Sequence, residues 1–136
     1  MFNGGQPIPH LATAAATHRS PEQAKLVELV LDVHDGRLDL AKASAENLIN
    51  GNTRIVSLTW ASNVLGTINP ISQIAAQAHA VGAVMVVDGS QAVPQLSTPV
   101  PALGADLVAF TGHKMVGPTG IGALWGRYDL LAELPP

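Results

Sequence analysis

The chain has 136 residues, of which 47% are hydrophobic and 12% charged, with a formal net charge of −3 and no cysteine. That length suits a single domain. The seven Lys and Arg residues form no basic block, which disfavours nucleic-acid binding. The lack of cysteine excludes disulfides, thiolate metal sites and a cysteine nucleophile within these residues. No apolar run is long enough to span a membrane and the first residues lack signal-peptide character, so we expect a cytoplasmic protein.

The first part of the chain is predicted to pass from irregular to ordered structure. Residues 1–24 carry only two charges and show neither a helical nor a strand period, which predicts an irregular segment ahead of an ordered part that starts near Lys25. Val and Leu partly alternate over 25–33, which predicts a strand. A helix is then expected over 40–49, before an Asn-Gly end signal.

The rest of the chain alternates strands and helices. A helix is predicted from Pro70 to Gly82, because Asn69 is a good N-cap, Pro70 suits the first helical position and apolar residues follow at helical spacing. Short apolar runs rich in β-branched residues predict strands at 54–59, 83–87, 107–110 and 121–125. This alternation predicts an α/β fold in three layers, with a mainly parallel sheet and helices on its faces.

Polar residues follow three of these strands, at the edge where α/β sheets bind ligands. The predicted strands lead respectively into Ser62-Asn63, Asp88-Gly89-Ser90-Gln91 and Thr111-Gly112-His113-Lys114. Facing one crevice, these segments would offer a carboxylate, two amides, hydroxyls, an imidazole and a lysine.

Lys114 and Asp88 each have two interpretations. A loop lysine is usually solvated, but a partly buried lysine near positive charge forms Schiff bases with carbonyl compounds. A carboxylate directly after an apolar strand either caps a turn or pairs with a buried cation. Pyridoxal phosphate favours the second interpretation of both, because its aldehyde takes a lysine, its protonated ring nitrogen needs an acid and its phosphate needs hydroxyl and amide donors. Asp88, Lys114 and Thr111 fit these demands.

Other ligand motifs do not fit. His113 separates Gly112 from Lys114, which breaks the pattern of a phosphate-binding loop, and the glycines of residues 120–126 lead into a predicted strand instead of opening the helix of a dinucleotide site. The five histidines show no metal-ligand spacing, so no metal site is predicted. His79 is interpreted as a surface or half-buried structural histidine.

Three motifs carry a family resemblance. They are ASNVLGTINPI from Ala61, VDGSQAVP from Val87 and TGHKMVGPTGIGALWGR from Thr111, and their order and spacing resemble those of cysteine desulfurases. These enzymes belong to the class V aminotransferase group, and the chain is most similar to the branch shared with selenocysteine lyases. The resemblance implies a truncated, central part of the large domain of a fold type I, pyridoxal phosphate-dependent transferase.

The resemblance implies a role for each candidate site residue. Lys114 would bind the cofactor aldehyde and move protons once the substrate displaces it. Asp88 would pair with the protonated ring nitrogen. The resemblance gives the remaining roles as phosphate binding by Thr111 and His113, a hydrogen bond to the phenolic oxygen of the ring by Gln91, and a place near the cofactor and the substrate for Asn63.

The family also implies a reaction and its partners. L-cysteine or L-selenocysteine would be the substrate, and in desulfurases a mobile cysteine thiolate takes the sulfur as a persulfide, leaving alanine, and passes it to an acceptor protein of iron–sulfur cluster assembly. Members act as homodimers. The chain has no cysteine and ends at Pro136, before the family's persulfide cysteine, and residues 1–24 do not resemble the family. We therefore expect a fragment that does not transfer sulfur alone.

Two alternatives stay open at this point. A selenocysteine lyase or another class V enzyme would share Lys114 and Asp88 with a desulfurase. A non-catalytic α/β remnant or interaction domain would keep the motifs without binding a cofactor. Retention of pyridoxal phosphate by the purified chain separates the remnant from the enzymes.

Overall fold

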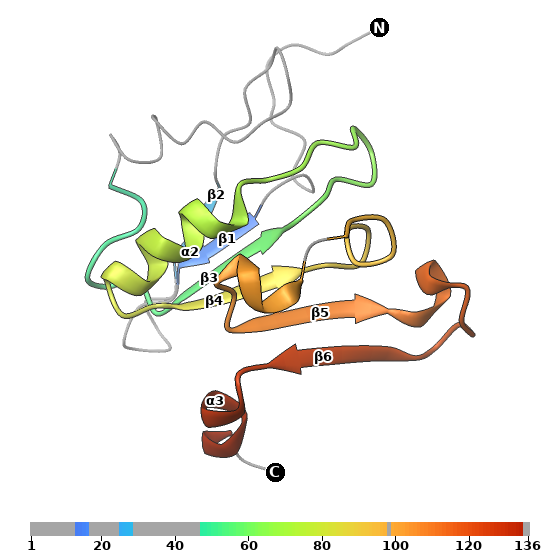
Figure 1. Cartoon of the computed structure of the whole chain (residues 1–136). Helices are drawn as coiled ribbons and strands as arrows, with labels where there is room; N and C mark the ends of the chain where they lie inside the picture. The colour runs from blue at the N-terminus through green and yellow to red at the C-terminus, as the bar shows by residue number, and fades with distance from the viewer. Residues whose placement is uncertain (1–12, 17–24, 29–46, 98, 135–136) are drawn as a thin grey trace, which may run out of the picture.

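The computed structural model describes residues 13–16, 25–28, 47–97 and 99–134. Its main feature is a four-stranded sheet with the order β3-β4-β5-β6 (Figure 1). β3, β4 and β5 are parallel, whereas β6 runs antiparallel to β5 at the edge. The predicted α/β class with a mainly parallel sheet is confirmed. The strands are β3 (Ile55–Thr59), β4 (Val84–Asp88), β5 (Leu107–Thr111) and β6 (Gly122–Gly126).

The connections explain these strand directions. α2 (Ile71–Ala80) lies between β3 and β4, and the 3-10 helix η2 (Val100–Leu103) lies between β4 and β5. Such crossovers make neighbouring strands parallel. A turn through η3 (Gly112–Met115) reverses the chain between β5 and β6, and α3 (Tyr128–Glu133) follows. No helix in the described part of the chain is long and apolar enough to cross a membrane.

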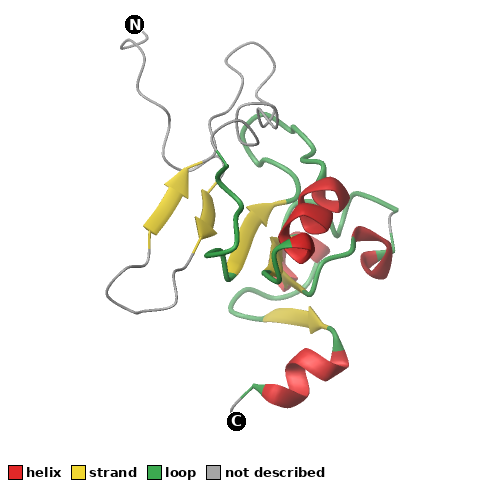
Figure 2. Cartoon of the chain, turned by 90° about the vertical axis from the view of Figure 1, so that its left-hand side faces the viewer, coloured by secondary structure: helices red, strands yellow, loops and turns green. Residues whose placement is uncertain are grey.

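The core lies between the sheet and α2. Side chains alternate between the faces of a strand, and those that point toward α2 are buried. Figure 2 shows α2 along this face of the sheet. Burial contributes about 1.5–3 kcal/mol for each large aliphatic side chain, so packing holds α2 in place. The buried residues are Val56, Leu58, Met85, Val87 and Val108 of the strands and Ile71, Ile74, Ala75 and Ala78 of α2. The prediction of three layers also requires helices on the face of the sheet opposite α2. That third layer is not among the described residues.

The start of α2 differs from the prediction. Pro70 is the N-cap residue, and no side chain caps the helix. Asn69 is 5% exposed, and its Nδ2 donates a hydrogen bond to the carbonyl oxygen of Thr59 at 2.6 Å. The predicted N-cap role of Asn69 is wrong because its amide binds the end of β3 instead of the first turn of α2. This hydrogen bond closes the loop between the two elements.

A separate two-stranded antiparallel sheet contains β1 (Thr13–Ala16) and β2 (Lys25–Glu28). β2 confirms a strand at the start of the predicted range 25–33. β1 corrects the prediction that 1–24 is irregular throughout. Backbone pairing with β2 forms this strand, whereas its Ala-rich sequence shows no strand period. The remaining residues of 1–24 and of 25–33 lie outside the described residues.

The predicted helix over 40–49 is described only at its end. Residues up to 46 lie outside the described residues, and 47–50 form turns and bends instead of helix. Asn47 has a positive φ of 50°, and the Nδ2 of Asn50 donates to the carbonyl oxygen of Asn47 at 2.9 Å. The prediction of helix over 47–49 is therefore wrong, because Asn47 turns the chain earlier.

Candidate functional site

Three parallel strands end side by side at one edge of the sheet, which we call the carboxyl edge. Thr59 pairs with Asp88, and Asp88 pairs with Ala109. Beyond the strand ends, the Trp60 N–H donates to the carbonyl oxygen of Asp88 at 2.9 Å, and the Gly89 N–H donates to that of Ala109 at 2.8 Å. The predicted meeting of the strand ends is confirmed: the segments that follow β3, β4 and β5 leave the sheet at one edge (Figure 1).

Asp88 is the last residue of β4, and it is exposed. Its Oδ1 accepts a hydrogen bond from the Ser90 N–H at 2.9 Å, which is a turn-capping contact. Among the described residues, no donor contacts Oδ2 of Asp88. The turn therefore uses one carboxylate oxygen and leaves the other for a cationic ligand.

Position 89 requires glycine, and this requirement fixes the turn that carries Gln91. A Cβ on Gly89 would lie 2.9 Å from Cγ2 of Val93 and 3.0 Å from Cγ1 of Val108. The Val93 N–H donates back to the Gly89 carbonyl oxygen at 2.8 Å, so the chain turns directly after β4. Gln91 is half-buried in this turn, and its Oε1 has a long contact of 3.5 Å with Nε2 of Gln95. Gln91 is thus held at the carboxyl edge.

The end of β5 supplies a hydroxyl, an imidazole and a lysine. Thr111 Oγ1 and His113 Nδ1 are hydrogen-bonded at 2.7 Å. Lys114 is half-buried in η3, directly after His113. When the hydroxyl of Thr111 donates to Nδ1, the neutral imidazole carries its proton on Nε2 and donates from there. This segment therefore presents an anion-binding donor beside a primary amine.

Glycines hold η3 against the end of β5. The Gly112 N–H donates to the carbonyl oxygen of Ile121, and the Gly117 N–H donates to that of Gly112, both at 2.9 Å. A Cβ on Gly112 would lie 2.7 Å from Cγ2 of Ile121, and a Cβ on Gly122 would lie 2.9 Å from the carbonyl oxygen of Phe110. A side chain at either position would push the loop away, so these glycines keep η3 in place.

Asn63 follows β3, whereas the other five candidate residues lie at or just after the ends of β4 and β5. It is exposed on the loop between β3 and α2. Oγ of Ser62 accepts hydrogen bonds from the Val64 and Leu65 N–H groups at 3.2 Å, which shapes the turn on which Asn63 sits. No hydrogen bond joins Asn63 to the other candidates. The structure therefore brings the other five to the adjacent ends of β4 and β5 and leaves Asn63 on the neighbouring loop.

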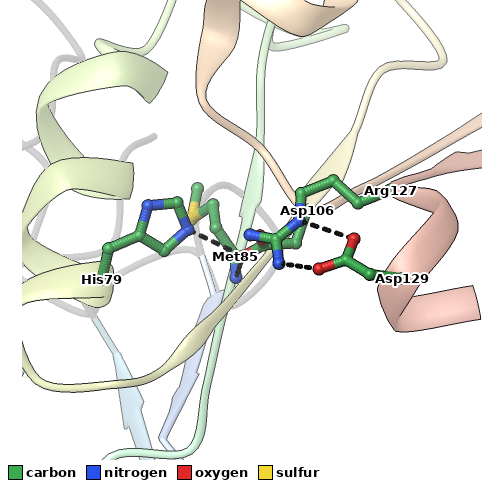
Figure 3. A network of polar contacts seen from close by, with 5 residues as sticks. All are labelled: His79, Met85, Asp106, Arg127 and Asp129. Carbon is green, nitrogen blue, oxygen red and sulfur yellow. Dashed lines mark hydrogen bonds and ion pairs between the residues drawn. The ribbon is translucent and has the colours of Figure 1, made fainter. Parts of the chain in front are cut away.

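A buried polar network lies at the opposite edge, the amino edge, where β5 begins (Figure 3). Asp106 is 3% exposed. Its Oδ2 accepts a hydrogen bond from the Met85 N–H at 2.7 Å and contacts Nε2 of His79 at 2.8 Å, while its Oδ1 accepts from Nη1 of Arg127 at 2.8 Å. The structural role predicted for His79 agrees with this contact. The sequence motifs missed Asp106, although a carboxylate between apolar residues was a signal for it.

Arg127 also binds an exposed carboxylate. Its Nη2 donates to Oδ2 of Asp129 at 2.6 Å, and its Nε donates to Oδ1 at 3.2 Å. The hydrogen bonding from Arg127 is the main cause that lowers the pKa of Asp129 below its usual value. The same pairing raises the pKa of Arg127. Both side chains are therefore charged at neutral pH.

In the described ranges, no group of three His, Asp or Glu side chains is placed to hold a metal ion.

The fold and the carboxyl edge define an α/β protein that presents a lysine and a carboxylate at the ends of adjacent parallel strands. The aminotransferase class-V family model matches residues 9–136, and the chain belongs to this family. The match begins within the segment 1–24. The domain boundary at residue 25 stays a prediction.

Two relatives similar in sequence are named as a probable cysteine desulfurase and a cysteine desulfurase. A probable cysteine desulfurase from Streptomyces coelicolor is 54% identical over 102 residues, and a cysteine desulfurase from Dickeya dadantii is 51% identical over 102 residues. Each alignment covers 75% of this chain and 24% of the relative, so the chain spans about a quarter of the length of these relatives.

Solved structures agree with this assignment. The apo structure of a cysteine desulfurase from Thermococcus onnurineus matches with a TM-score of 0.69 at 35% identity, covering 79% of this chain and 26% of that one. A cysteine desulfurase from Escherichia coli matches with a TM-score of 0.68 at 39% identity, covering 77% of this chain and 26% of that one. The family resemblance of the motifs is therefore confirmed in both sequence and fold.

Proposed function

We propose that this chain is the pyridoxal phosphate-binding part of a cysteine desulfurase, with residues 25–136 forming part of its large domain. One observation carries the proposal: β4 and β5 end side by side, so that Asp88 and the segment from Thr111 to Lys114 lie at one edge of the sheet. Class V aminotransferases and cysteine desulfurases depend on pyridoxal phosphate, whose groups need the donors and acceptors present at this edge.

The chemistry of the carboxyl edge fits the cofactor. Asp88 has one oxygen on the Ser90 N–H and a second that no described donor contacts, as a partner of a protonated ring nitrogen requires. The hydrogen-bonded pair of Thr111 and His113 has one N–H or O–H donor to offer a phosphate in either neutral tautomer, and Lys114 follows directly in η3. These groups come from two adjacent strand ends, which the backbone hydrogen bond from Gly89 to Ala109 holds together.

Each side chain then has a separate task. When bound, pyridoxal phosphate supplies an electron sink for the α-carbon of the substrate. Nζ of Lys114 binds the cofactor and, once the substrate replaces it, accepts and returns the α-carbon proton. The carboxylate of Asp88 would accept a hydrogen bond from the protonated ring nitrogen. In the same proposal Thr111 and His113 bind phosphate oxygens, Gln91 donates to the ring oxygen, and Asn63 contacts the cofactor and the substrate from the neighbouring loop.

For the whole protein we propose the conversion of L-cysteine to L-alanine. The carbon–sulfur bond of the substrate breaks, a sulfur–sulfur bond forms on a cysteine thiolate, and a persulfide remains. These 136 residues contain no cysteine, so the thiolate comes from outside them and we expect no sulfur transfer by this chain alone. Transfer to an acceptor of iron–sulfur cluster assembly, a homodimer and a cytoplasmic location complete the proposal, and L-selenocysteine is the alternative substrate.

Trapping of the cofactor on the chain tests the proposal. The purified chain is mixed with pyridoxal phosphate, its visible spectrum is recorded, the complex is reduced with borohydride and the labelled lysine is mapped by mass spectrometry. We expect the label on Lys114 and not on Lys25 or Lys42. Asp88→Ala removes the partner of the ring nitrogen and should abolish the band.

The matched control is Asp129→Ala, which removes an exposed carboxylate away from the carboxyl edge and should leave the label unchanged. The absence of a visible band, or a label spread evenly over Lys25, Lys42 and Lys114, contradicts the proposal. That outcome would favour the remnant that keeps the motifs without a working site.

A further inference from the structure

Asp106 holds both sides of β5 at the amino edge. On one side, the Asp106 N–H donates to the carbonyl oxygen of Met85 at 2.9 Å, and its Oδ2 accepts from the Met85 N–H at 2.7 Å. On the other side, the Arg127 N–H donates to the carbonyl oxygen of Asp106 at 3.0 Å, and Nη1 of Arg127 donates to Oδ1 at 2.8 Å. One residue therefore binds β4 and the residue after β6 through both its backbone and its side chain.

These hydrogen bonds lie where the pairing of β4 with β5 begins. The register starts with Val86 opposite Leu107, the residues that directly follow Met85 and Asp106. A slip of one residue would move β5 by about 3.3 Å and turn its side chains to the opposite faces. It would also separate Oδ2 of Asp106 from the Met85 N–H, and a buried carboxylate that loses a donor is strongly unfavourable. The carboxylate therefore selects one register.

The most buried polar side chain of the network is that of Asp106. The side chain of Asp106 is 4% exposed, whereas those of His79 and Arg127 are 40% and 49% exposed. His79 reaches Asp106 from α2 and Arg127 reaches it from the end of β6, as Figure 3 shows. Partners from α2 and from the residue after β6 thus converge on a buried group.

We propose that Asp106 is a positioning residue for the carboxyl edge: by fixing the register of β4 against β5, it sets where Asp88 lies relative to Thr111 and Lys114. β4 leads from the Met85 contact to Asp88, and β5 leads from Asp106 to Thr111, each over a strand of only 5 residues. Such short paired strands transmit the register from one edge to the other. The consequence for cofactor binding rests on the proposed function, whereas the register does not.

Amide hydrogen exchange in the full chain, followed by NMR, tests the register. Two amides report on it: that of Met85, which Asp106 binds, and that of Gly89, whose hydrogen bond to Ala109 lies at the carboxyl edge. In Asp106→Ala we expect exchange at both amides to become at least about tenfold faster relative to the amides of β3, because a hydrogen bond to a charged group is lost and β4 and β5 separate locally.

The conservative variant and a control isolate the effect. Asp106→Asn keeps an oxygen for the Met85 N–H but presents an amide N–H to Arg127, so we expect intermediate acceleration at both reporters. Asp129→Asn removes only the exposed partner of Arg127 and should change neither. Unchanged exchange at Gly89, or equal acceleration at all amides, overturns the proposal. Where Asp106→Ala does not fold, Asp106→Asn decides, and exchange at Gly89 equal to that of the control overturns it.

Cofactor retention separates this proposal from the proposed function. In a wild-type chain that retains pyridoxal phosphate, read by visible absorbance after gel filtration, we expect Asp106→Ala to weaken the apparent affinity about tenfold, Asp106→Asn less, and Asp129→Asn not at all. Unchanged affinity in both Asp106 variants overturns the positioning role. A wild-type chain that retains no cofactor contradicts the proposed function, while exchange at Gly89 still decides the role of Asp106.

Discussion

Each of the two edges of the sheet has an aspartate at a strand end, and the two aspartates differ in burial. Asp88 at the carboxyl edge is exposed, and its carboxylate accepts one hydrogen bond from the described residues, that of the Ser90 N–H. Asp106 at the amino edge is 3% exposed, and both of its carboxylate oxygens are bound. A buried charge is tolerated only when its partners are fixed, whereas an exposed carboxylate with an oxygen to spare can bind a ligand. The role of each aspartate therefore follows from its surroundings, and its place at a strand end does not determine it.

Replacing each aspartate by alanine tests whether burial sets its contribution to stability. Asp106→Ala should lower the free energy of unfolding by about 2–4 kcal/mol, because it leaves the buried Met85 N–H without an acceptor and removes the charged acceptor of Arg127. Asp88→Ala removes one exposed turn contact and should cost about 1 kcal/mol or less. Urea unfolding followed by tryptophan fluorescence, which comes from the buried Trp60 and from Trp125 of β6, measures both. Equal costs for the two variants would show that burial does not separate the two edges.

Asn69 is buried near the carboxyl edge, although Asp88 at the same edge is exposed. Asn69→Asp tests whether its burial or a capping role determines its contribution to stability. An aspartate is as good an N-cap as asparagine, so a capping role predicts little change. The observed contact predicts a loss of about 1–3 kcal/mol, because the new carboxylate cannot donate to the Thr59 carbonyl oxygen and is buried beside it. Thermal unfolding measures the difference. The exposed Asn63→Asp on the same loop is the control, and an equally small change in both variants would restore the capping role.

Gly89→Ala tests whether the carboxyl edge depends on close packing. The added Cβ would meet Val93 and Val108 at 2.9 and 3.0 Å, and overpacking of this kind costs about 1–3 kcal/mol. Gly51→Ala is the matched control, since a Cβ there meets nothing within 4 Å and should leave stability nearly unchanged. Urea unfolding compares the pair. Equal stability of the two variants would mean that the turn after β4 adapts and does not fix Gln91.

The strands and the carboxyl edge were predictable because the signals for them are local. Apolar runs rich in β-branched residues mark β3, β4 and β5, and a polar residue directly follows the apolar run of each of the last two. The alternation with α2 predicts parallel neighbours, which bring Asp88 and Thr111 to the same edge. The roles of these residues toward a cofactor are predictions that rest on the family.

The network and the loop closure escaped prediction because their partners are distant along the chain. Asp106 binds His79 from 27 residues away and Arg127 from 21, and Asn69 binds Thr59 from 10. Residue type alone made Asn69 an N-cap, since a sequence does not show which carbonyl an amide will meet. β1 escaped because its four small residues have no readable period, and its partner β2 lies in a separate segment of the chain.

The smallest expected effect concerns Asp106 and Asp129, the two carboxylates that bind Arg127. Hydrogen bonding from Arg127 lowers the pKa of Asp129 in the folded chain, so this pair stabilises the fold above the unfolded-state pKa and the contribution is lost as pH falls through the folded-state pKa. Both side chains are exposed, at 49% and 67%, so salt should screen the pair. Raising the ionic strength from about 0.01 M to about 1 M should move the pKa of Asp129 back toward its usual value, as measured by carboxyl ¹³C NMR. In Arg127→Gln the pKa of Asp129 should be near that value at every salt concentration. A pKa of Asp129 that stays low at high salt would show that salt does not screen this exposed pair. Burial would then not distinguish the contact of Arg127 with Asp106 from its contact with Asp129.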